Sequence, residues 1–298
     1  MKTKKLITIW LKEIRANFLV LSVVLVGIGG TAAWHKGCFN IILFVFTIFG
    51  VVFAHISVDL FNEYSDWRTG IDARTIRTRF SGGSGNLQKG LLKPEQVYIA
   101  AWMTLVIAFL IGLGLAWVSG WQILFLMAAG GAAIVFYTDY ITRWMLGELT
   151  SGITLGSFVV IGAYYVQTGS MTSDIIWASI PPGILTMILL LLNEFPDVEA
   201  DRMGGRKHMV IMLGEKRAAY VYGLLLVMIY SVLIVGTILG KIPKTGLIGL
   251  LTIPLAVITA YRVVRYANDS GKIIPALGMN VIVVLATDVL MALGFVIG

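Results

Sequence analysis

Cysteine and charged side chains are both scarce in this chain of 298 residues. The single thiol, Cys38, excludes an internal disulfide and a metal site built from cysteines. Aspartate, glutamate, lysine and arginine make up 13% of the residues, whereas hydrophobic residues make up 58%. A soluble protein of this length could not bury so much apolar surface. We therefore expect the lipid bilayer to be the solvent for most of the chain.

Long apolar segments take the place of the missing charge. A helix needs about 20 apolar residues to cross the hydrocarbon core, and windows of that length predict an all-α membrane protein with nine transmembrane helices in one bundle. The fifth segment is rich in glycine, serine and threonine, so we expect it to pack closely against other helices. The whole chain, residues 1–298, is predicted to form a single integral-membrane domain. The predicted spans cover residues 17–34, 40–60, 96–118, 121–138, 148–166, 174–194, 218–239, 245–266 and 273–296.

The positions of lysine and arginine predict the orientation. In the nine-helix topology all but three of the 23 lysines and arginines fall on one side, which is therefore expected to be cytoplasmic. We predict a multi-pass protein of the cell membrane with its N-terminus in the cytoplasm and its C-terminus outside. The net charge of +7 follows from this bias and requires no nucleic-acid partner. The exceptions are Lys36, Lys241 and Lys244.

The N-terminal residues are basic and lead into an apolar run, as in a signal peptide. The apolar run is too long for a signal peptide, and further spans follow it. We expect residues 4–16 to form an amphipathic helix at the cytoplasmic surface of the membrane.

One acidic pentad occurs twice, as NEYSD at residues 62–66 and as NEFPD at residues 193–197. The copies end the second and sixth predicted spans, so both reach the cytoplasmic side. They predict two halves, residues 17–138 and 148–266, related by a pseudo-twofold repeat, with the ninth span outside it. Parallel repeats place a functional site at their interface, so we expect cytoplasmic loops to cap a central cavity there. Chance similarity between two acidic helix ends is the alternative.

Helical spacing groups the polar residues of each copy. Residues four apart share a helical face, which joins Asn62 to Asp66, and Asn193 to Asp197 and Asp201. Converging carboxylates repel unless cations neutralise them, and hard oxygen ligands suit Mg²⁺, which commonly bridges carboxylates to phosphates. We therefore predict a diphosphate held between the two copies through Mg²⁺.

Basic residues follow both copies and would bind phosphate oxygens directly. Cytoplasmic loops carry lysine and arginine in any case, so ordinary charged loops are the alternative. The basic residues are Arg74, Arg77 and Arg79 after the first copy, and Arg206 and Lys207 after the second.

The two motifs resemble those of the UbiA superfamily of intramembrane prenyltransferases, in particular its MenA-like branch. Members carry Asn-x-x-x-Asp with a downstream aspartate after span two, and Asp-x-x-x-Asp after span six. The common form has the downstream aspartate where this chain has Gly70. The matching residues are Asn62, Asp66 and Asp72 in the first motif, and Asp197 and Asp201 in the second.

Four further segments carry the same resemblance, which covers nearly the whole chain. Residues 13–17 are similar to an Arg-Pro-x-Thr segment, with alanine in place of proline. Residues 137–143 resemble a Tyr-Thr…Lys segment, with arginine in place of lysine. Residues 146–148 resemble the Leu-Gly-Glu of MenA-like proteins, and residues 204–208 stand where the family has Gly-Lys-Arg-Thr.

The resemblance implies Mg²⁺-dependent transfer of an isoprenyl group from a polyprenyl diphosphate to an acceptor, with release of diphosphate. The acceptor would most often be an aromatic ring, as in quinone biosynthesis, and membrane lipid would surround the protein. The implied metal ligands are Asn62, Asp66, Asp72, Asp197 and Asp201, of which all but Asp72 are also the implied catalytic residues. The implied diphosphate contacts are Arg15, Asn193, Arg79, Tyr137, Arg143, Arg206 and Lys207.

Several roles remain open. His55 could help to remove a proton from the acceptor or be an ordinary buried histidine. Asp59 could join the metal site, act as a base or pair with an arginine, and Arg74 is a further candidate for the phosphates. A glyceryl lipid is the alternative acceptor. A secondary transporter is the alternative class, although acids at helix ends flanked by arginines favour phosphate chemistry.

Overall fold

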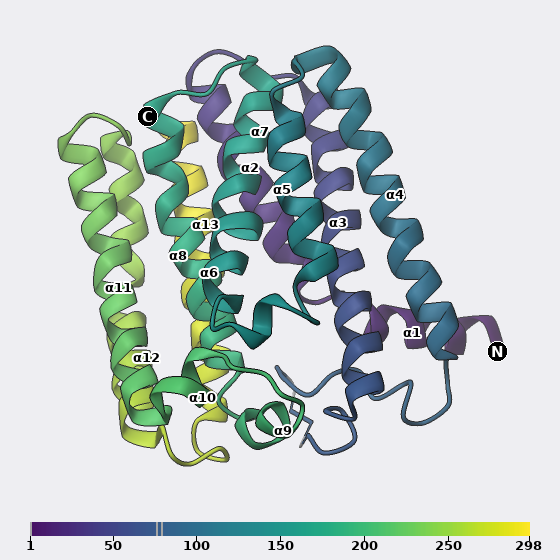
Figure 1. Ribbon diagram of the computed structural model, residues 1–298. Coiled ribbons are helices and arrows are strands. Elements are labelled where there is room, and N and C mark those ends of the chain that lie inside the picture. Colours follow the sequence, from purple (N-terminus) through teal and green to yellow (C-terminus); the bar gives the residue numbers. More distant parts are fainter. Residues whose placement is uncertain (1, 76, 79) are drawn as a thin grey trace.

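The computed structural model describes residues 2–75, 77–78 and 80–298. These residues fold into helices joined by loops, and the long helices run side by side in one bundle (Figure 1). Helix α1 (Lys2–Glu13) runs crosswise near one end of the bundle. The short helices α9 (Val198–Met203) and α10 (Met209–Leu213) lie at the same end, which we call the capped end. The C-terminus lies at the opposite end.

Seven helical segments among the described residues are long and apolar enough to cross a membrane. The chain is therefore a multi-pass helical membrane protein. Two more apolar helices are shorter, α2 (Leu19–His35) with 17 residues and α5 (Ile123–Phe136) with 14, so nine crossings stay a prediction. The seven segments are α3 (Ile41–Thr69), α4 (Pro94–Ser119), α6 to α7 (Gly147–Thr168), α8 (Ser173–Asn193), α11 (Glu215–Ile238), η3 with α12 (Lys244–Tyr266) and α13 (Ile274–Ile297).

Apolar side chains cover the outside of the bundle and also fill its centre. Trp117 is 92% exposed and Ile238 is 77% exposed, which suits contact with lipid rather than water. In the interior Leu25 of α2, Ile188 of α8 and Ile229 of α11 are fully buried in one cluster. The bundle thus has a packed core and an apolar exterior, as a bilayer protein requires.

Helix α3 carries the whole first pentad, because it continues past the predicted span to Thr69. The helix ends at Gly70, whose φ of 75° is the left-handed conformation that glycine adopts without steric cost. The chain then turns back, so that the backbone N–H of Asp72 donates to the carbonyl of Asp66 at 3.4 Å. The turn at Gly70 therefore brings the backbone of Asp72 back beside Asp66.

The second pentad does not lie on one continuous helix, which corrects the argument from a shared face. Helix α8 ends at Asn193, and Asp197 is the N-cap of α9. Pro196 lies between them and has no N–H with which to continue the helical ladder. Asp197 and Asp201 remain one helical turn apart, since the N–H of Asp201 donates to the Asp197 carbonyl at 2.9 Å.

Glycines bring the fifth predicted segment against α8. This segment comprises α6 (Gly147–Ser151), the π-helical turn η2 (Gly152–Ser157) and α7 (Phe158–Thr168). A Cβ atom at Gly156 would lie 2.6 Å from the Cα atom of Gly183 in α8. The expected close packing is confirmed, and it places the start of α6 beside the end of α8.

Replacing Gly156 with alanine is expected to destabilise the protein by about 2 kcal/mol, because backbone atoms of α8 cannot move aside for the new methyl group. The melting temperature in detergent measures the effect. Gly114→Ala in α4 is the matched control, since a Cβ atom there meets no described atom within 4 Å. Equal decreases in melting temperature for the two variants would contradict the packing argument.

Candidate active site

A cavity of about 800 Å³ lies inside the bundle and collects both acidic motifs. Much of its wall is apolar, with contributions from Phe109 of α4, Met127 of α5 and Phe158 of α7. The other part is polar and charged. The polar lining includes Arg15, Asn62, Asp66, Asp72, Tyr137, Asn193, Glu194, Asp197, Asp201, Arg206 and His208. The cavity can thus take a molecule with an apolar body, and an anionic end together with cations that neutralise the carboxylates of the wall.

Arg206 joins the two motifs. Its Nη1 donates to Oδ1 of Asp201 at 2.9 Å, and its Nη2 donates to Oδ1 of Asp66. The side chains of Arg206, Asp66 and Asp201 are 16%, 6% and 4% exposed. A buried carboxylate is stable only with a partner, and here one guanidinium serves a carboxylate from each motif.

Other oxygen atoms in this wall have room for a ligand. Among the described residues, Oδ1 of Asn193 and Oδ1 of Asp197 are buried without a hydrogen-bond partner. Asp72 accepts one side-chain hydrogen bond, from Nε2 of Gln88 at 3.1 Å. Carboxylate and amide oxygens are the ligands that Mg²⁺ prefers. The donor set of the two motifs therefore fits the predicted metal.

Asp72 and Asp197 do not pair with Arg206, and positive charge does not neutralise them fully. Burial, reinforced by neighbouring carboxylates, raises the pKa of Asp72 and of Asp197 to about 7 each. Burial acts on Asp201 in the same direction, but Arg206 and His208 outweigh it and lower the pKa of Asp201. Cations bound beside Asp72 and Asp197 would favour their ionised forms.

Arg15 binds the first motif from the segment between α1 and α2. Its Nε and Nη2 donate to Oε1 of Glu63 at 3.0 and 2.8 Å, and Nη2 also donates to Oδ1 of Asn62 at 3.1 Å. Glu63 in addition accepts from the backbone N–H of Ser84 at 3.0 Å. Arg15 lines the cavity, as its predicted role requires, but Glu63 holds it there, and the sequence did not single out Glu63.

Of the neighbours Arg206 and Lys207, only Arg206 belongs to the described wall of the cavity, so the diphosphate contact of Lys207 stays a prediction. Residues 206–208 lie outside the helices, between α9 and α10, and the backbone at His208 is extended. Arg206 and His208 line the cavity, whereas the Lys207 side chain is exposed. Its backbone N–H donates to the carbonyl of Thr142 at 2.8 Å.

Tyr137 and Asn193 line the cavity, where a diphosphate contact requires them, but two of the other candidates for the phosphates do not. Arg143 lies in the short turn η1 (Ile141–Arg143) and is exposed, and so is Arg74 in the loop after α3. Both are absent from the described wall of the cavity. Arg79 lies outside the described residues.

His55 and Asp59 line the cavity one turn apart on α3. His55 Nδ1 makes a hydrogen bond of 2.8 Å with the hydroxyl of Ser22, and His55 Nε2 lies 3.8 Å from Oδ2 of Asp59. Both residues are therefore held in place and still reach the cavity, so the two roles weighed for His55 remain open.

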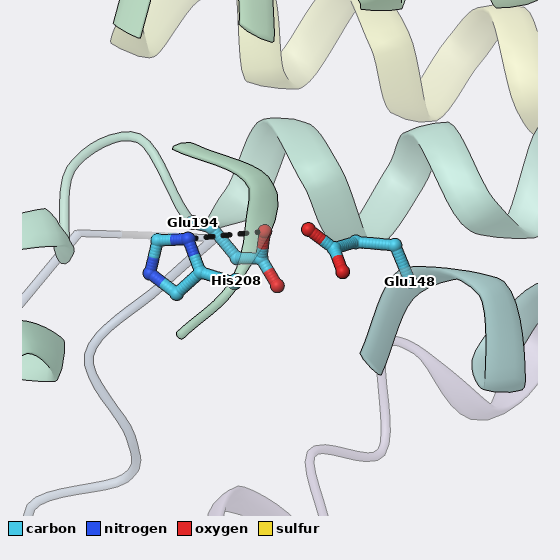
Figure 2. A group of neighbouring side chains, drawn as sticks. All are labelled: Glu148, Glu194 and His208. Carbon is cyan, nitrogen blue, oxygen red and sulfur yellow. Dashed lines mark ion pairs between the residues drawn. The ribbon is translucent and has the colours of Figure 1, made fainter. Parts of the chain in front are cut away.

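A cluster that the sequence did not reveal adjoins the second motif. Glu148 of α6, Glu194 after α8 and His208 before α10 point toward one another (Figure 2). Nδ1 of His208 lies 3.5 Å from Oε2 of Glu194, and its Nε2 lies 3.3 Å from Oδ2 of Asp201. One signal was present, because Glu194 holds the same pentad position as Glu63.

The fold and this cavity define an intramembrane enzyme for a substrate with an anionic end and an apolar body. The chain belongs to the UbiA prenyltransferase family, which residues 20–281 match. This match confirms the resemblance drawn from the motifs, and with it the prediction of a prenyltransferase.

Relatives and solved structures agree with this family. The 1,4-dihydroxy-2-naphthoate octaprenyltransferase of Bacillus subtilis is 32% identical over 208 residues, which cover 68% of this chain and 65% of that protein. The 2-carboxy-1,4-naphthoquinone phytyltransferase of Synechocystis is 27% identical over 306 residues, which cover 98% and 94%. A UbiA homolog from Archaeoglobus fulgidus, solved with GPP and Mg²⁺, superimposes with a TM-score of 0.64 at 10% identity over 95% of this chain and 99% of that one. This last likeness shows a shared fold.

Replacing Glu63 with alanine is expected to destabilise the protein by about 3 kcal/mol, because Arg15 would keep a partly buried charge without its main partner. Thermal unfolding in detergent measures the loss. Glu199→Ala serves as the control, since the Glu199 side chain is 77% exposed and its pairing with Arg202 should contribute little. Similar melting temperatures for the two variants would show that the Arg15 pairing is dispensable.

Proposed function

We propose that this chain transfers an isoprenyl group from a polyprenyl diphosphate to a naphthalene-type aromatic ring and releases diphosphate. The observation that carries the proposal is the meeting of both acidic motifs in one cavity whose remaining wall is apolar. The acceptor class rests on the two relatives, whose names both specify such a ring. Those names differ in the prenyl group, so the chain length of the donor stays open.

The polar wall binds the diphosphate. Arg206 lies between the motifs with two N–H groups directed at carboxylates, and it can donate to phosphate oxygens that enter there. Arg15 and Tyr137 line the same wall. Mg²⁺ would neutralise the diphosphate and so stabilise its departure. The residues that would hold it are Asn62, Asp66, Asp72, Asp197 and Asp201.

The apolar wall holds the isoprenyl chain and excludes water. The bond between the first isoprenyl carbon and the diphosphate oxygen breaks, and its electron pair leaves with the diphosphate. The allylic cation bonds to an electron-rich carbon of the ring, and that carbon then gives up its proton to a base in the cavity wall, for which His55 and Asp59 are the candidates. Aromatic side chains in the wall, Phe109, Phe136 and Phe158, stabilise the cation, and the absence of water protects it from hydrolysis.

We also propose the finer topology predicted from the sequence, with nine crossings, the N-terminus cytoplasmic and the C-terminus outside the cell membrane. The basic bias of the loops supports this orientation, as do termini at opposite ends of the bundle (Figure 1). Equivalent pentad positions support the repeat of two halves in one domain. Glu63 lies beside Arg15, and Glu194 lies beside His208.

Replacing Asp66 or Asp197 with asparagine should lower the rate of prenyl transfer at least about a hundredfold. Each change removes a negative charge that would hold the cations to which the diphosphate binds. The assay follows diphosphate release from geranyl and longer diphosphates with naphthoate acceptors, with and without Mg²⁺. Glu199→Gln on the exposed face of α9 is the control and should keep full activity. Unimpaired Mg²⁺-dependent activity in both aspartate variants would refute the proposed site.

The neighbours Arg206 and Lys207 provide a second test, because they differ in whether they face the cavity. Arg206→Gln should raise KM for the prenyl diphosphate at least about tenfold, through loss of a charge-assisted contact to phosphate. Lys207→Gln should leave KM nearly unchanged. Steady-state kinetics on both variants make the comparison, and a larger effect from Lys207 would reverse the assignment made here.

A further inference from the structure

Glu148, Glu194 and His208 form a polar centre that the proposed prenyl transfer does not use. We infer that these three residues bind a divalent transition-metal cation of the Zn²⁺ type, at a site distinct from the Mg²⁺ site of the two motifs. The inference stands on the geometry of the cluster and does not depend on the proposed reaction.

The ligand atoms have the spacing of a nearly formed site. One atom from each of the three residues lies within 4.8 Å of the other two, and Nδ1 of His208 is 3.5 Å from Oε2 of Glu194. Bonds of 2.0–2.1 Å in a tetrahedral zinc site place ligand atoms about 3.3 Å apart. The ligand atoms would thus need to approach one another by at most about 1.5 Å to hold zinc.

The cluster contains buried polar atoms that call for a partner. Within the described residues, Oε2 of Glu148 is buried and accepts no hydrogen bond, and Oε2 of Glu194 and the ring nitrogens of His208 are buried with only the ion-pair contacts of His208 to Glu194 and Asp201. Glu148 is 0% exposed and His208 is 3% exposed, so bulk water does not compensate. The other oxygen of Glu148, Oε1, accepts from the backbone N–H of Met209 at 2.6 Å. That bond orients the carboxylate and leaves Oε2 as the ligand atom.

His208 is oriented as metal-binding histidines usually are. Its Nδ1 faces Glu194, and its Nε2 lies 3.3 Å from Oδ2 of Asp201. A metal-bound imidazole almost always directs its second N–H at a carboxylate or carbonyl, which sets the tautomer and strengthens the ligand. Asp201 fills that position, so Nδ1 is the ligand atom.

The donor set favours Zn²⁺ over Mg²⁺. Mg²⁺ requires a nearly octahedral shell of oxygens, whereas an imidazole with two carboxylates suits Zn²⁺. Two carboxylates also balance the charge of one divalent cation, which removes the repulsion between Glu148 and Glu194. Three protein ligands leave one position open. Glu194 and His208 also line the cavity, so the site adjoins the space in which a substrate would bind.

Zinc binding to the purified full-length protein tests the inference. The protein in detergent is loaded with Zn²⁺ in excess Mg²⁺ and desalted, the retained zinc is measured by mass spectrometry, and its affinity by competition with a chelator. The wild type should retain one Zn²⁺ per chain. Glu148→Gln and His208→Gln should each bind it at least about tenfold more weakly. Unchanged zinc affinity in both variants would overturn the inference.

Two comparison variants separate this site from its surroundings. Asp66→Asn lies in the Mg²⁺ site and should retain Zn²⁺, and Glu199→Gln should do so as an exposed acid near the capped end. If Asp66→Asn loses the zinc while Glu148→Gln keeps it, the metal belongs to the two motifs and the inference is wrong.

A measurement on the wild type covers the case in which the variants fail to fold. X-ray absorption at the zinc edge should show nitrogen and oxygen ligands at about 2.0–2.1 Å with the signature of one imidazole. A shell of oxygens without imidazole, or no zinc retained after desalting, would overturn the inference.

Discussion

The structure depends on arginines that neutralise buried carboxylates inside the bundle. Asp66 and Asp201 come from different halves of the chain, and Arg206 binds both. Arg15 plays a comparable part for Glu63. Breaking such buried pairs is costly, since the charge left behind keeps its desolvation penalty. Arg206 therefore links α3 to α9, and Arg15 links α3 to the segment between α1 and α2, while both arginines line the cavity.

The arginines of the cavity do not neutralise all of its carboxylates, and the excess negative charge indicates what the cavity binds. Burial raises the pKa values of Asp72 and Asp197, and neighbouring carboxylates raise them further. A protein that needed only stability could have replaced these acids with apolar residues. Their retention in an otherwise apolar bundle fits a site that is completed by cations arriving with an anionic substrate.

Sequence reasoning predicted what depends on local pattern. Apolar run length located the helices, and the repeated pentad located the acids at Asp66 and Asp197. It failed where the outcome depends on how distant segments meet. Lys207 and Arg206 are indistinguishable by type and position, and only the path of the backbone after α9 turns one into the cavity. The partners of Glu63 and Glu194, Arg15 and His208, lie at least 14 positions away, so no spacing rule could pair them.

Asp201 connects the two cation sites argued for here. Its Oδ1 accepts from Arg206, and its Oδ2 lies beside His208, so the protein itself occupies both oxygens. A diphosphate entering between the motifs offers Arg206 stronger acceptors than the carboxylates it now binds. Arg206 can then turn toward the phosphate, which frees Asp66 and Asp201 to bind cations. His208 keeps its own contact with Asp201 during this exchange. The second motif would thus stay anchored through Glu194 and Glu148 while its arginine changes partners.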